Sequence, residues 1–262
     1  FDASLLQECV ALLYRAYPHL NSRVTLRDGA PGQYVDPGQP EPAPFFDFSR
    51  TNKDGVSAWE TSVAREYMNL YDAPLSRFYL FKLSENSGGL LLKTHHIIAD
   101  AWTQVLINNH VMRNYLQLLK GEQPEAEPCP EYALHVASER DYIGSAAFER
   151  DFAYWQRQLN DLPPTFGNEQ NIAQISPVGK RCSRPLSGRM NRLISSYCAR
   201  NNVSPFAVLY MALAIYLKRI RCLDRFCIGV PTLNRLNFSE KQSAGMFVNT
   251  LPFVNQLDDC LS

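Results

Sequence analysis

The sequence is short of the features that mark membrane, nucleic-acid-binding and secreted proteins. No apolar run approaches the ~20 residues that a transmembrane helix needs, and 26 basic residues balance 26 acidic ones. We therefore expect no membrane span and no electrostatic attraction to nucleic acid. The first residues also show no signal-peptide pattern.

Paired cysteines and the commonest catalytic motifs are lacking as well. The seven cysteines are odd in number and scattered, with no CxxC. This favours reduced thiols and a cytoplasmic location over a disulfide framework or a zinc site. No GxSxG nucleophile elbow occurs, so a covalent serine mechanism has little support. No glycine-rich phosphate loop occurs either.

What is present is enough apolar and aromatic residues for a sizeable core, at 45% and 11% of 262 residues. Such a length suits one large domain or two small ones. The chain opens directly on a helical pattern and stops just after a strand pattern, and we expect a fragment of a larger protein.

Hydrophobic periodicity predicts a mixture of helices and strands. Helices are expected over residues 2–16, 56–70, 102–119, 132–143, 146–159, 188–200 and 205–218. Strands are expected over 22–26, 33–35, 78–83, 90–96, 226–230 and 247–254. The mixture, with a clear hairpin around residues 85–89, predicts an α+β sandwich rather than a doubly wound sheet.

The least structured stretch is residues 161–181, which is rich in proline, glycine and asparagine. Such composition is typical of a domain boundary. We therefore predict a first half over residues 1–165, a linker over 166–185, and a second, incomplete half over 186–262.

One stretch carries the residues best suited to catalysis, Lys93-Thr94-His95-His96-Ile97-Ile98-Ala99-Asp100-Ala101-Trp102. It follows an apolar run, so His95 and His96 are predicted at the end of a buried strand and Asp100 near the start of a helix. Side chains alternate across a strand, so the two histidines should point to opposite faces. A histidine there can exchange a proton near neutral pH.

The residues alone leave alternatives open. The histidines can be ordinary ones, and Asp100 can serve only as a helix cap. Spacing does not guarantee contact between His96 and Asp100, because a turn lies between them. A metal site is disfavoured, since adjacent strand residues diverge and the spacing matches no recognised zinc pattern.

Two further stretches stand out. Residues 228–235, Ile-Gly-Val-Pro-Thr-Leu-Asn-Arg, run from a strand into a turn that ends at Arg235. Residues 245–252, Gly-Met-Phe-Val-Asn-Thr-Leu-Pro, place Asn249 inside an apolar strand. A buried polar side chain needs a partner, so Asn249 either makes a structural hydrogen bond or lines a cavity.

Taken together, these stretches resemble condensation domains of nonribosomal peptide synthetases. Residues 95–102 resemble the HHxxxDG motif, 228–235 the GxPxxxR segment, and 245–252 the GxFVNTLP segment. The predicted first helix and residues 17–23, Tyr-Pro-His-Leu-Asn-Ser-Arg, are similar to the family's early segment. Order and spacing agree over essentially the whole chain.

The resemblance implies two chloramphenicol-acetyltransferase-like halves with the active site at their junction. Tunnels admit the phosphopantetheine arms of two carrier proteins, and the domain itself binds no cofactor or metal. One arm carries an acyl or peptidyl thioester, and the other an aminoacyl amine that attacks it. The expected partners are carrier domains and a neighbouring adenylation domain, in secondary metabolite biosynthesis.

The same resemblance implies roles for individual residues. His96 is the catalytic histidine, as a base or as a group that positions the amine, and it is expected to face the cleft. His95 is its structural neighbour and is expected to point away into the core of the first half. Asp100 is a structural anchor that pairs with Arg235. Three residues are expected to line the cleft: Ala101, Trp102 and Asn249.

The chain departs from the family pattern in two respects. Ala101 replaces the motif's glycine, which is expected to narrow the acceptor channel or to change the turn after Asp100. The family's opening segment and much of its second half are absent from the chain, which leaves open whether this piece is active.

Two other functions remain open. One is a stand-alone acyltransferase that takes its donor from CoA or a carrier. The other is a relative without condensation activity, either a docking module or an epimerisation-type domain, because epimerisation relatives share HHxxxDG. Donor and acceptor specificity depends on tunnel shape, which the sequence does not reveal.

Overall fold

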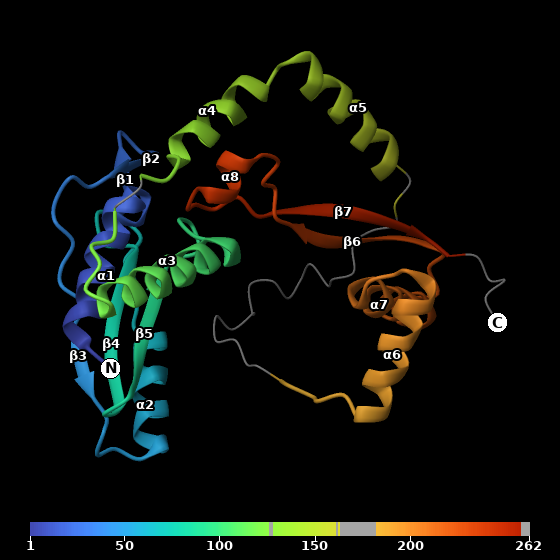
Figure 1. Cartoon of the computed structure of the whole chain (residues 1–262). Helices are drawn as coiled ribbons and strands as arrows, with labels where there is room; N and C mark the ends of the chain where they lie inside the picture. The colour runs from blue at the N-terminus through green and yellow to red at the C-terminus, as the bar shows by residue number, and fades with distance from the viewer. Residues whose placement is uncertain (126–127, 161, 163–181, 258–262) are drawn as a thin grey trace. The chain divides into compact units, whose positions relative to one another are not determined.

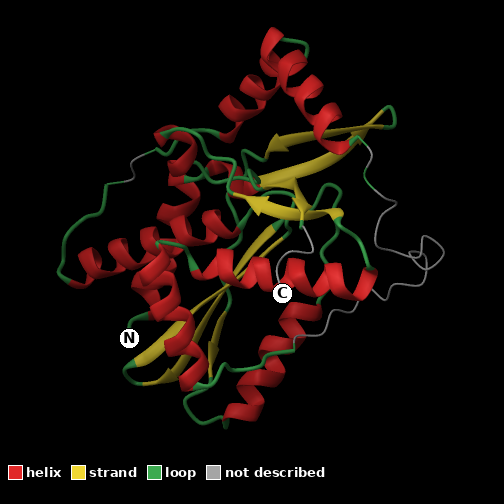
Figure 2. Cartoon of the chain, turned by 90° about the vertical axis from the view of Figure 1, so that its right-hand side faces the viewer, coloured by secondary structure: helices red, strands yellow, loops and turns green. Residues whose placement is uncertain are grey.

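The computed structural model describes residues 1–125, 128–160, 162 and 182–257. The chain divides into two compact units (Figure 1). The first is formed by Phe1–Ser145 and Pro231–Asn249, and the second by Ala146–Val230 and Thr250–Ser262. Helices and strands are mixed (Figure 2), which confirms the α+β prediction.

The first unit holds most of the secondary structure. Its elements are α1 (Ala3–Ala16), the 3-10 helix η1 (Pro18–Asn21), β1 (Ser22–Arg27), β2 (Ala30–Val35), β3 (Phe45–Asp47), α2 (Lys53–Arg65), β4 (Ser76–Ser84), β5 (Ser87–Thr94), α3 (Ala101–Leu119), α4 (Tyr132–Tyr142) and α8 (Phe238–Gln242). The second unit holds α5 (Ala146–Leu159), α6 (Gly188–Asn201), α7 (Pro205–Arg221) and most of β6 (Arg225–Thr232) and β7 (Asn249–Gln256).

The centre of the first unit is a three-stranded sheet of order β3-β4-β5, with α1 and α3 packed together over it (Figure 1). β4 runs parallel to β3 and antiparallel to β5. Alternate residues of β4 supply the two faces of the sheet. Phe78 and Leu80 join the main core with α1 and α3, whereas the rings of Tyr79 and Phe81 lie 6.4 and 5.8 Å from that of Trp59 on α2. The sheet therefore has a helix layer on each face.

α1 forms for the reasons expected from its sequence. The Asp2 carboxylate accepts hydrogen bonds from the backbone N–H groups of Ser4 and Leu5, at 2.8 and 3.1 Å, and so caps the helix. One face is buried, and its residues are Leu6, Cys9, Val10, Leu12, Leu13 and Ala16. The amphipathic pattern thus fixes which side of α1 meets the sheet.

α2 begins and ends earlier than predicted. Asn52 caps it by accepting a hydrogen bond from the N–H of Gly55 at 2.9 Å, so the helix starts at Lys53 rather than at residue 56. It ends at Arg65, where Glu66 turns toward the sheet and its carboxylate meets Arg77 at 2.8 Å. The apolar periodicity over residues 66–70 predicted a longer helix, but the backbone of Glu66 has left the helical conformation, with φ −56° and ψ 130°.

α8 was missed by the periodicity argument because it is only five residues long. It has a capping box, in which Asn237 accepts from the N–H of Glu240 at 2.8 Å and Glu240 accepts from the N–H of Asn237 at 3.3 Å. An Asn followed three residues later by Glu is a signal for a helix start that was present in the sequence.

The unit boundaries differ from the predicted halves. α5, predicted in the first half, belongs to the second unit, whereas residues 231–249 belong to the first unit instead of the second half. Buried contacts of Arg235 and Phe247 with Asp100 hold that segment in the first unit. The predicted linker over 166–185 lies largely outside the described residues, so its position stays a prediction.

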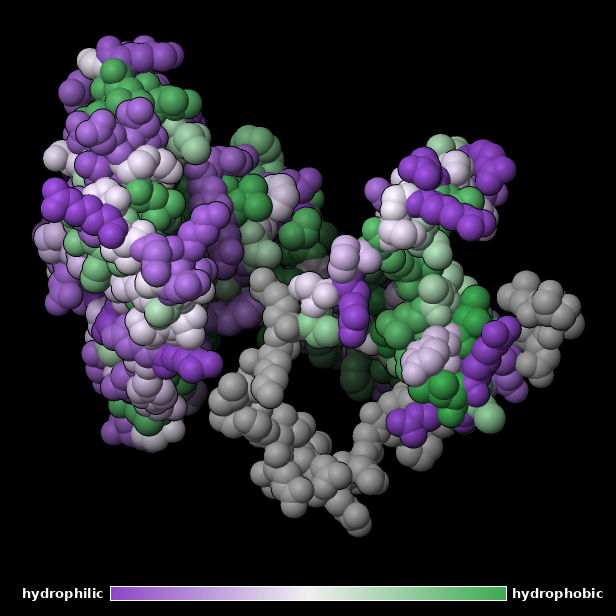
Figure 3. Space-filling view, turned by 90° about the horizontal axis from the view of Figure 1, so that it is seen from below, coloured by the Kyte–Doolittle hydropathy of each residue, from purple (hydrophilic) through white to green (hydrophobic). Residues whose placement is uncertain are grey.

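The second unit exposes many large apolar side chains on α6 and α7 (Figure 3). They include Met190, Leu193, Tyr197, Phe206, Leu209 and Tyr216. In the described part of the chain, no single helix is long and apolar enough to cross a membrane. The pair α6 and α7, bent by 107°, passes such a test by length and composition alone.

Candidate active site

The two histidines lie in a turn rather than in a strand. β5 ends at Thr94, and the N–H of His95 then bonds to the carbonyl of Leu75 at 2.8 Å. The N–H of Ile98 bonds back to the carbonyl of His95 at 3.1 Å, which closes the turn. The predicted strand over 90–96 is therefore two residues too long, and strand alternation does not orient these side chains.

His95 and His96 differ in exposure. His96 is exposed, whereas His95 is half-buried. The Nδ1 atom of His95 accepts a hydrogen bond from the N–H of Ile97 at 3.2 Å, so His95 holds the turn together locally. It is not one of the buried core residues, contrary to the prediction, because the strand that would have carried it inward has already ended.

Asp100 begins α3 and is almost fully buried. Its Oδ1 accepts hydrogen bonds from the N–H of Thr103 at 2.8 Å and from the hydroxyl of Thr103 at 2.9 Å. Its Oδ2 accepts from the N–H of Phe247 at 3.1 Å. Asp100 is thus a helix cap, and it also ties α3 to a segment far along the chain.

The predicted ion pair between Asp100 and Arg235 is present. The Nη2 atom of Arg235 lies 3.1 Å from both carboxylate oxygens of Asp100. The two side chains are 1% and 2% exposed, for Arg235 and Asp100 respectively. A pair so deeply buried is poorly screened by water, and each charge depends on the other.

Arg235 also gathers the backbone around it. It donates to the carbonyls of Glu240 and Ser243, and to that of Gly245 at 3.3 Å. Its guanidinium carbon lies 3.8 Å from the centre of the Phe247 ring, a cation–π contact. The guanidinium thus fixes the loop from α8 to β7 against the start of α3.

The protonation of Asp100 is set by opposing influences. Burial acts to raise the pKa of its carboxyl group, but the hydrogen bonds from Thr103 and Phe247 and the charge of Arg235 outweigh it. The pKa of Asp100 therefore lies below its usual range, and the group is ionised at neutral pH.

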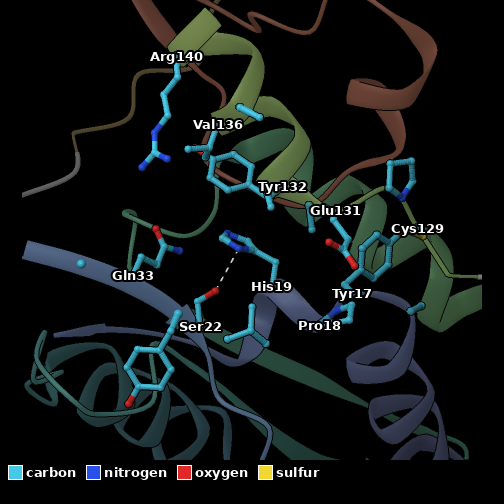
Figure 4. Close-up of a pocket in the computed structure, with 18 of the residues that line it drawn as sticks. Tyr17, Pro18, His19, Ser22, Gln33, Cys129, Glu131, Tyr132, Val136 and Arg140 are labelled. Carbon is cyan, nitrogen blue, oxygen red and sulfur yellow. Dashed lines mark hydrogen bonds between the residues drawn. The ribbon is translucent and has the colours of Figure 1, made fainter.

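A third histidine, His19, stabilises the turn that carries His95 and His96. The Nε2–H of His19 donates to the carbonyl of Ile98 at 3.1 Å, and its Nδ1 accepts from the hydroxyl of Ser22 at 3.0 Å (Figure 4). Burial lowers the pKa of His19 to about 4, so the ring is neutral. From the sequence, His19 was placed in the early family-like segment but no role was predicted for it, because no pattern in the neighbouring residues indicates its contact with Ile98.

The residues predicted to line the cleft have separate surroundings. Ala101 is exposed as the first residue of α3, and the turn before it forms without the motif's glycine. The indole Nε1–H of Trp102 donates to the carbonyl of Lys241 at 2.9 Å. Asn249 is exposed and lines a small pocket with Met246, Phe247 and Val248. That these three residues line a substrate cleft stays a prediction.

Metal binding has no support in the described part of the chain, where no three His, Cys, Asp or Glu residues gather to hold an ion. The geometry instead offers an exposed imidazole on a turn held by a buried ion pair and by a second, neutral imidazole. Such an arrangement can position a reactant and move one proton.

A comparison with protein families decides the identity of the fold. The family model described as "Condensation domain" matches residues 1–260. The chain belongs to the condensation domain family. This confirms the resemblance that the three motifs indicated.

The curated relatives of this condensation domain are large synthetases. Surfactin synthase subunit 1 of Bacillus subtilis (strain 168) is 29% identical over 261 residues, which are 98% of this chain and 7% of that protein. Cyclosporin synthetase simA of Tolypocladium inflatum is 24% identical over 250 residues, 94% of this chain and 2% of that protein. The chain thus spans less than a tenth of either relative.

Solved structures show the same fold. The first condensation domain of the calcium-dependent antibiotic synthetase, in complex with a substrate analogue, matches with a TM-score of 0.83 and 22% identity, over 98% of this chain and 62% of that one. VibH, a nonribosomal peptide synthetase condensation enzyme, matches with a TM-score of 0.78 and 22% identity, over 100% and 61%. The chloramphenicol-acetyltransferase-like fold is thereby shown, with the chain spanning about three fifths of these domains.

Proposed function

We propose that this condensation domain forms an amide bond in nonribosomal peptide synthesis. The observation that carries the proposal is the exposed His96, on a turn fixed by the buried pair of Asp100 and Arg235, within a chain of the condensation family. The donor is an acyl or peptidyl thioester, and the acceptor is an aminoacyl amine. Each is held on the phosphopantetheine arm of a carrier domain.

The reaction requires little of the protein beyond the positioning of the amine and the thioester. The amine nitrogen bonds to the thioester carbonyl carbon, the carbon–sulfur bond breaks, and the proton lost by the amine ends on the departing thiolate. His96 takes up that proton or holds the amine in line with the carbonyl. One histidine is sufficient, because thioester aminolysis is favourable and the chief need is to align two reactants away from water.

The surrounding residues act through the turn. Asp100 and Arg235 are positioning residues, because they hold the start of α3 and so the segment that precedes it. His95 and His19 brace the same turn from its two ends. The proposed partners are carrier domains and an adjacent adenylation domain. The proposed location is cytoplasmic, which suits the six described cysteines, none of which is in a disulfide.

The experiment compares donors. The full condensation domain that contains this chain is mixed with an aminoacyl-loaded carrier and with one acyl group presented either on a carrier or on CoA, and amide product is measured by mass spectrometry. We expect product from the carrier-bound donor. Product from the CoA thioester alone supports the acyltransferase alternative, and no product from either donor supports a docking or epimerisation-type role. Either result would contradict the proposal.

A further inference from the structure

The first unit contains a cavity of about 650 Å³ that neither His95 nor His96 lines. Its walls are β2, residues 16–22 and one face of α4 (Figure 4). Cavities of about 300–1,000 Å³ are typical of small-molecule sites. The size therefore suits an organic ligand rather than one or two water molecules.

Small side chains on facing walls keep this cavity open. α4 presents Ala133, Val136 and Ala137 to it, at the spacing of a single helix face. Pro31 and Gly32 on β2 also line it. None of the residues of α4 is buried. Among the described residues, no side chain from the facing wall therefore packs against this face of α4 and fills the cavity.

Aromatic rings dominate the rest of the lining. Tyr17, His19 and Tyr132 lie around the floor (Figure 4), and the rings of His19 and Tyr132 are 4.6 Å apart with planes inclined by 37°. Both nitrogens of His19 already have partners, so its ring is available for stacking rather than for a polar contact. Rings arranged in this way favour an aromatic ligand, in offset-stacked or edge-to-face contact.

Charged groups lie at opposite ends of the cavity. Arg140 and Gln33 are at one end and Glu131 is at the other, beside Tyr17 (Figure 4). Nine residues of helix separate Glu131 from Arg140, which places them about 13 Å apart along the axis. Among the described residues no carboxylate pairs with Arg140. A guanidinium with a neighbouring amide is well suited to a carboxylate.

We propose that this cavity binds an aromatic carboxylic acid. The aromatic body lies among Tyr17, His19 and Tyr132, and the carboxylate meets Arg140 and Gln33. Glu131 repels a second carboxylate at the other end, so the site prefers monocarboxylic to dicarboxylic acids. The site is separate from His96 and does not rest on the proposed amide chemistry. His19 links the two places, because it lines the cavity and bonds to Ile98.

The test uses indole propionate as the probe and isothermal titration calorimetry as the measurement. Val136→Trp places a large ring in the cavity and should weaken binding about tenfold or more. The matched control is Leu134→Trp, on the same helix but on the opposite face, which should bind as the unchanged chain does. Equal affinity in the two variants would overturn the proposal.

The charge is tested with a neutral analogue. Indole propanol has the same ring and chain but no carboxylate, and it should bind about tenfold more weakly than indole propionate. Arg140→Gln should remove that difference. An alcohol that binds as tightly as the acid would show that Arg140 does not read a carboxylate, and would overturn the ligand class proposed.

A third experiment uses the unchanged chain, so its result does not depend on whether a variant folds. Cys129 lines the cavity, whereas Cys182 and Cys222 are exposed elsewhere. Indole propionate should slow the alkylation of Cys129 by iodoacetamide and leave the other two rates unchanged, as read from peptide masses. Equal rates at Cys129 with and without the probe would show that the cavity stays empty.

Discussion

Arg235 and Asp100 stand 135 positions apart in the sequence and meet at 3.1 Å inside the first unit. Their pairing joins the start of α3 to the segment between β6 and α8. Arg235 also donates to the carbonyls of Ser243 and Gly245 in the loop between α8 and β7, so this one side chain connects the GxFVNTLP-like segment to the helix that follows the turn of His95 and His96. A buried charge without its partner is costly, and both ends of this link are therefore sensitive to mutation.

Asp100→Ala should reduce the stability of the fold. It leaves the Arg235 charge buried and unpaired and removes the cap of α3, with an expected loss of about 3–5 kcal/mol in the free energy of unfolding. Urea denaturation measures it. The control is Arg77→Ala, which breaks the exposed pair with Glu66 and should cost about 1 kcal/mol or less. Equal losses would argue against a structural role for Asp100.

In the intact parent domain supplied with loaded carriers, His96→Ala should lower amide formation by about 10²–10⁴-fold, the usual contribution of a positioned proton-transfer group. The melting temperature should change little, because His96 is exposed. Ile97→Ala alters the neighbouring exposed side chain on the same turn and should keep its activity. Mass spectrometry of the product, beside thermal melts, separates the two. Condensation by His96→Ala at the unchanged rate would remove this histidine from the mechanism.

His95→Ala should act mainly on stability. It removes the acceptor for the Ile97 N–H, a loss of about 1 kcal/mol, and the turn that carries His96 becomes less well held. We expect a lower melting temperature together with a smaller loss of activity than in His96→Ala. A variant with normal stability and no activity would instead place His95 among the reacting groups.

The neutral His19 makes stability dependent on pH. Its pKa is about 4 in the folded chain, against 6.5 for the unperturbed group, so the unfolded state binds a proton first as the pH falls. Above about pH 6.5 His19 is neutral in both states and does not reduce the free energy of unfolding. As the pH falls from 6.5 to about 4, only the unfolded state is protonated, and the free energy of unfolding decreases by on the order of 3 kcal/mol at most. His110, whose pKa burial also lowers, acts in the same direction.

His19→Gln tests this dependence, because glutamine can donate to the Ile98 carbonyl but does not titrate. Denaturation midpoints at pH 7 and pH 5 should differ less in His19→Gln than in the unchanged chain. An unaltered pH dependence would mean that His110 or other groups account for the acid sensitivity.

Ala101→Gly restores the residue that the family motif carries at this position. Ala101 is helical and exposed, so a glycine is not needed for the turn before α3. Replacing Ala101 by glycine should therefore lower the free energy of unfolding by about 1 kcal/mol or less. Any gain in amide formation with a bulky acceptor would show that the Ala101 methyl narrows the acceptor channel. Thermal melts and product yields with small and bulky acceptors measure the two effects separately.

The sequence by itself was enough for the elements that depend on neighbours along the chain. The helices α1, α3 and α7 lie where hydrophobic periodicity predicted them, to within three residues at each end, and Asp2, Asp100 and Ser204 cap their starts. Capping and periodicity act over a few residues, which is why they can be read directly. The motif order also indicated the family and the pairing of Asp100 with Arg235.

Tertiary structure alone decided what depends on distant residues. Glu66, where α2 stops short of its predicted end, contacts Arg77, Tyr79 and Lys93 on the sheet. His19 acquired its role only through Ile98, 79 positions away. The cavity exists because small residues of α4 and β2 face one another across space. Such contacts leave no periodic trace in the sequence, since packing and burial depend on which surfaces meet and not on their order along the chain.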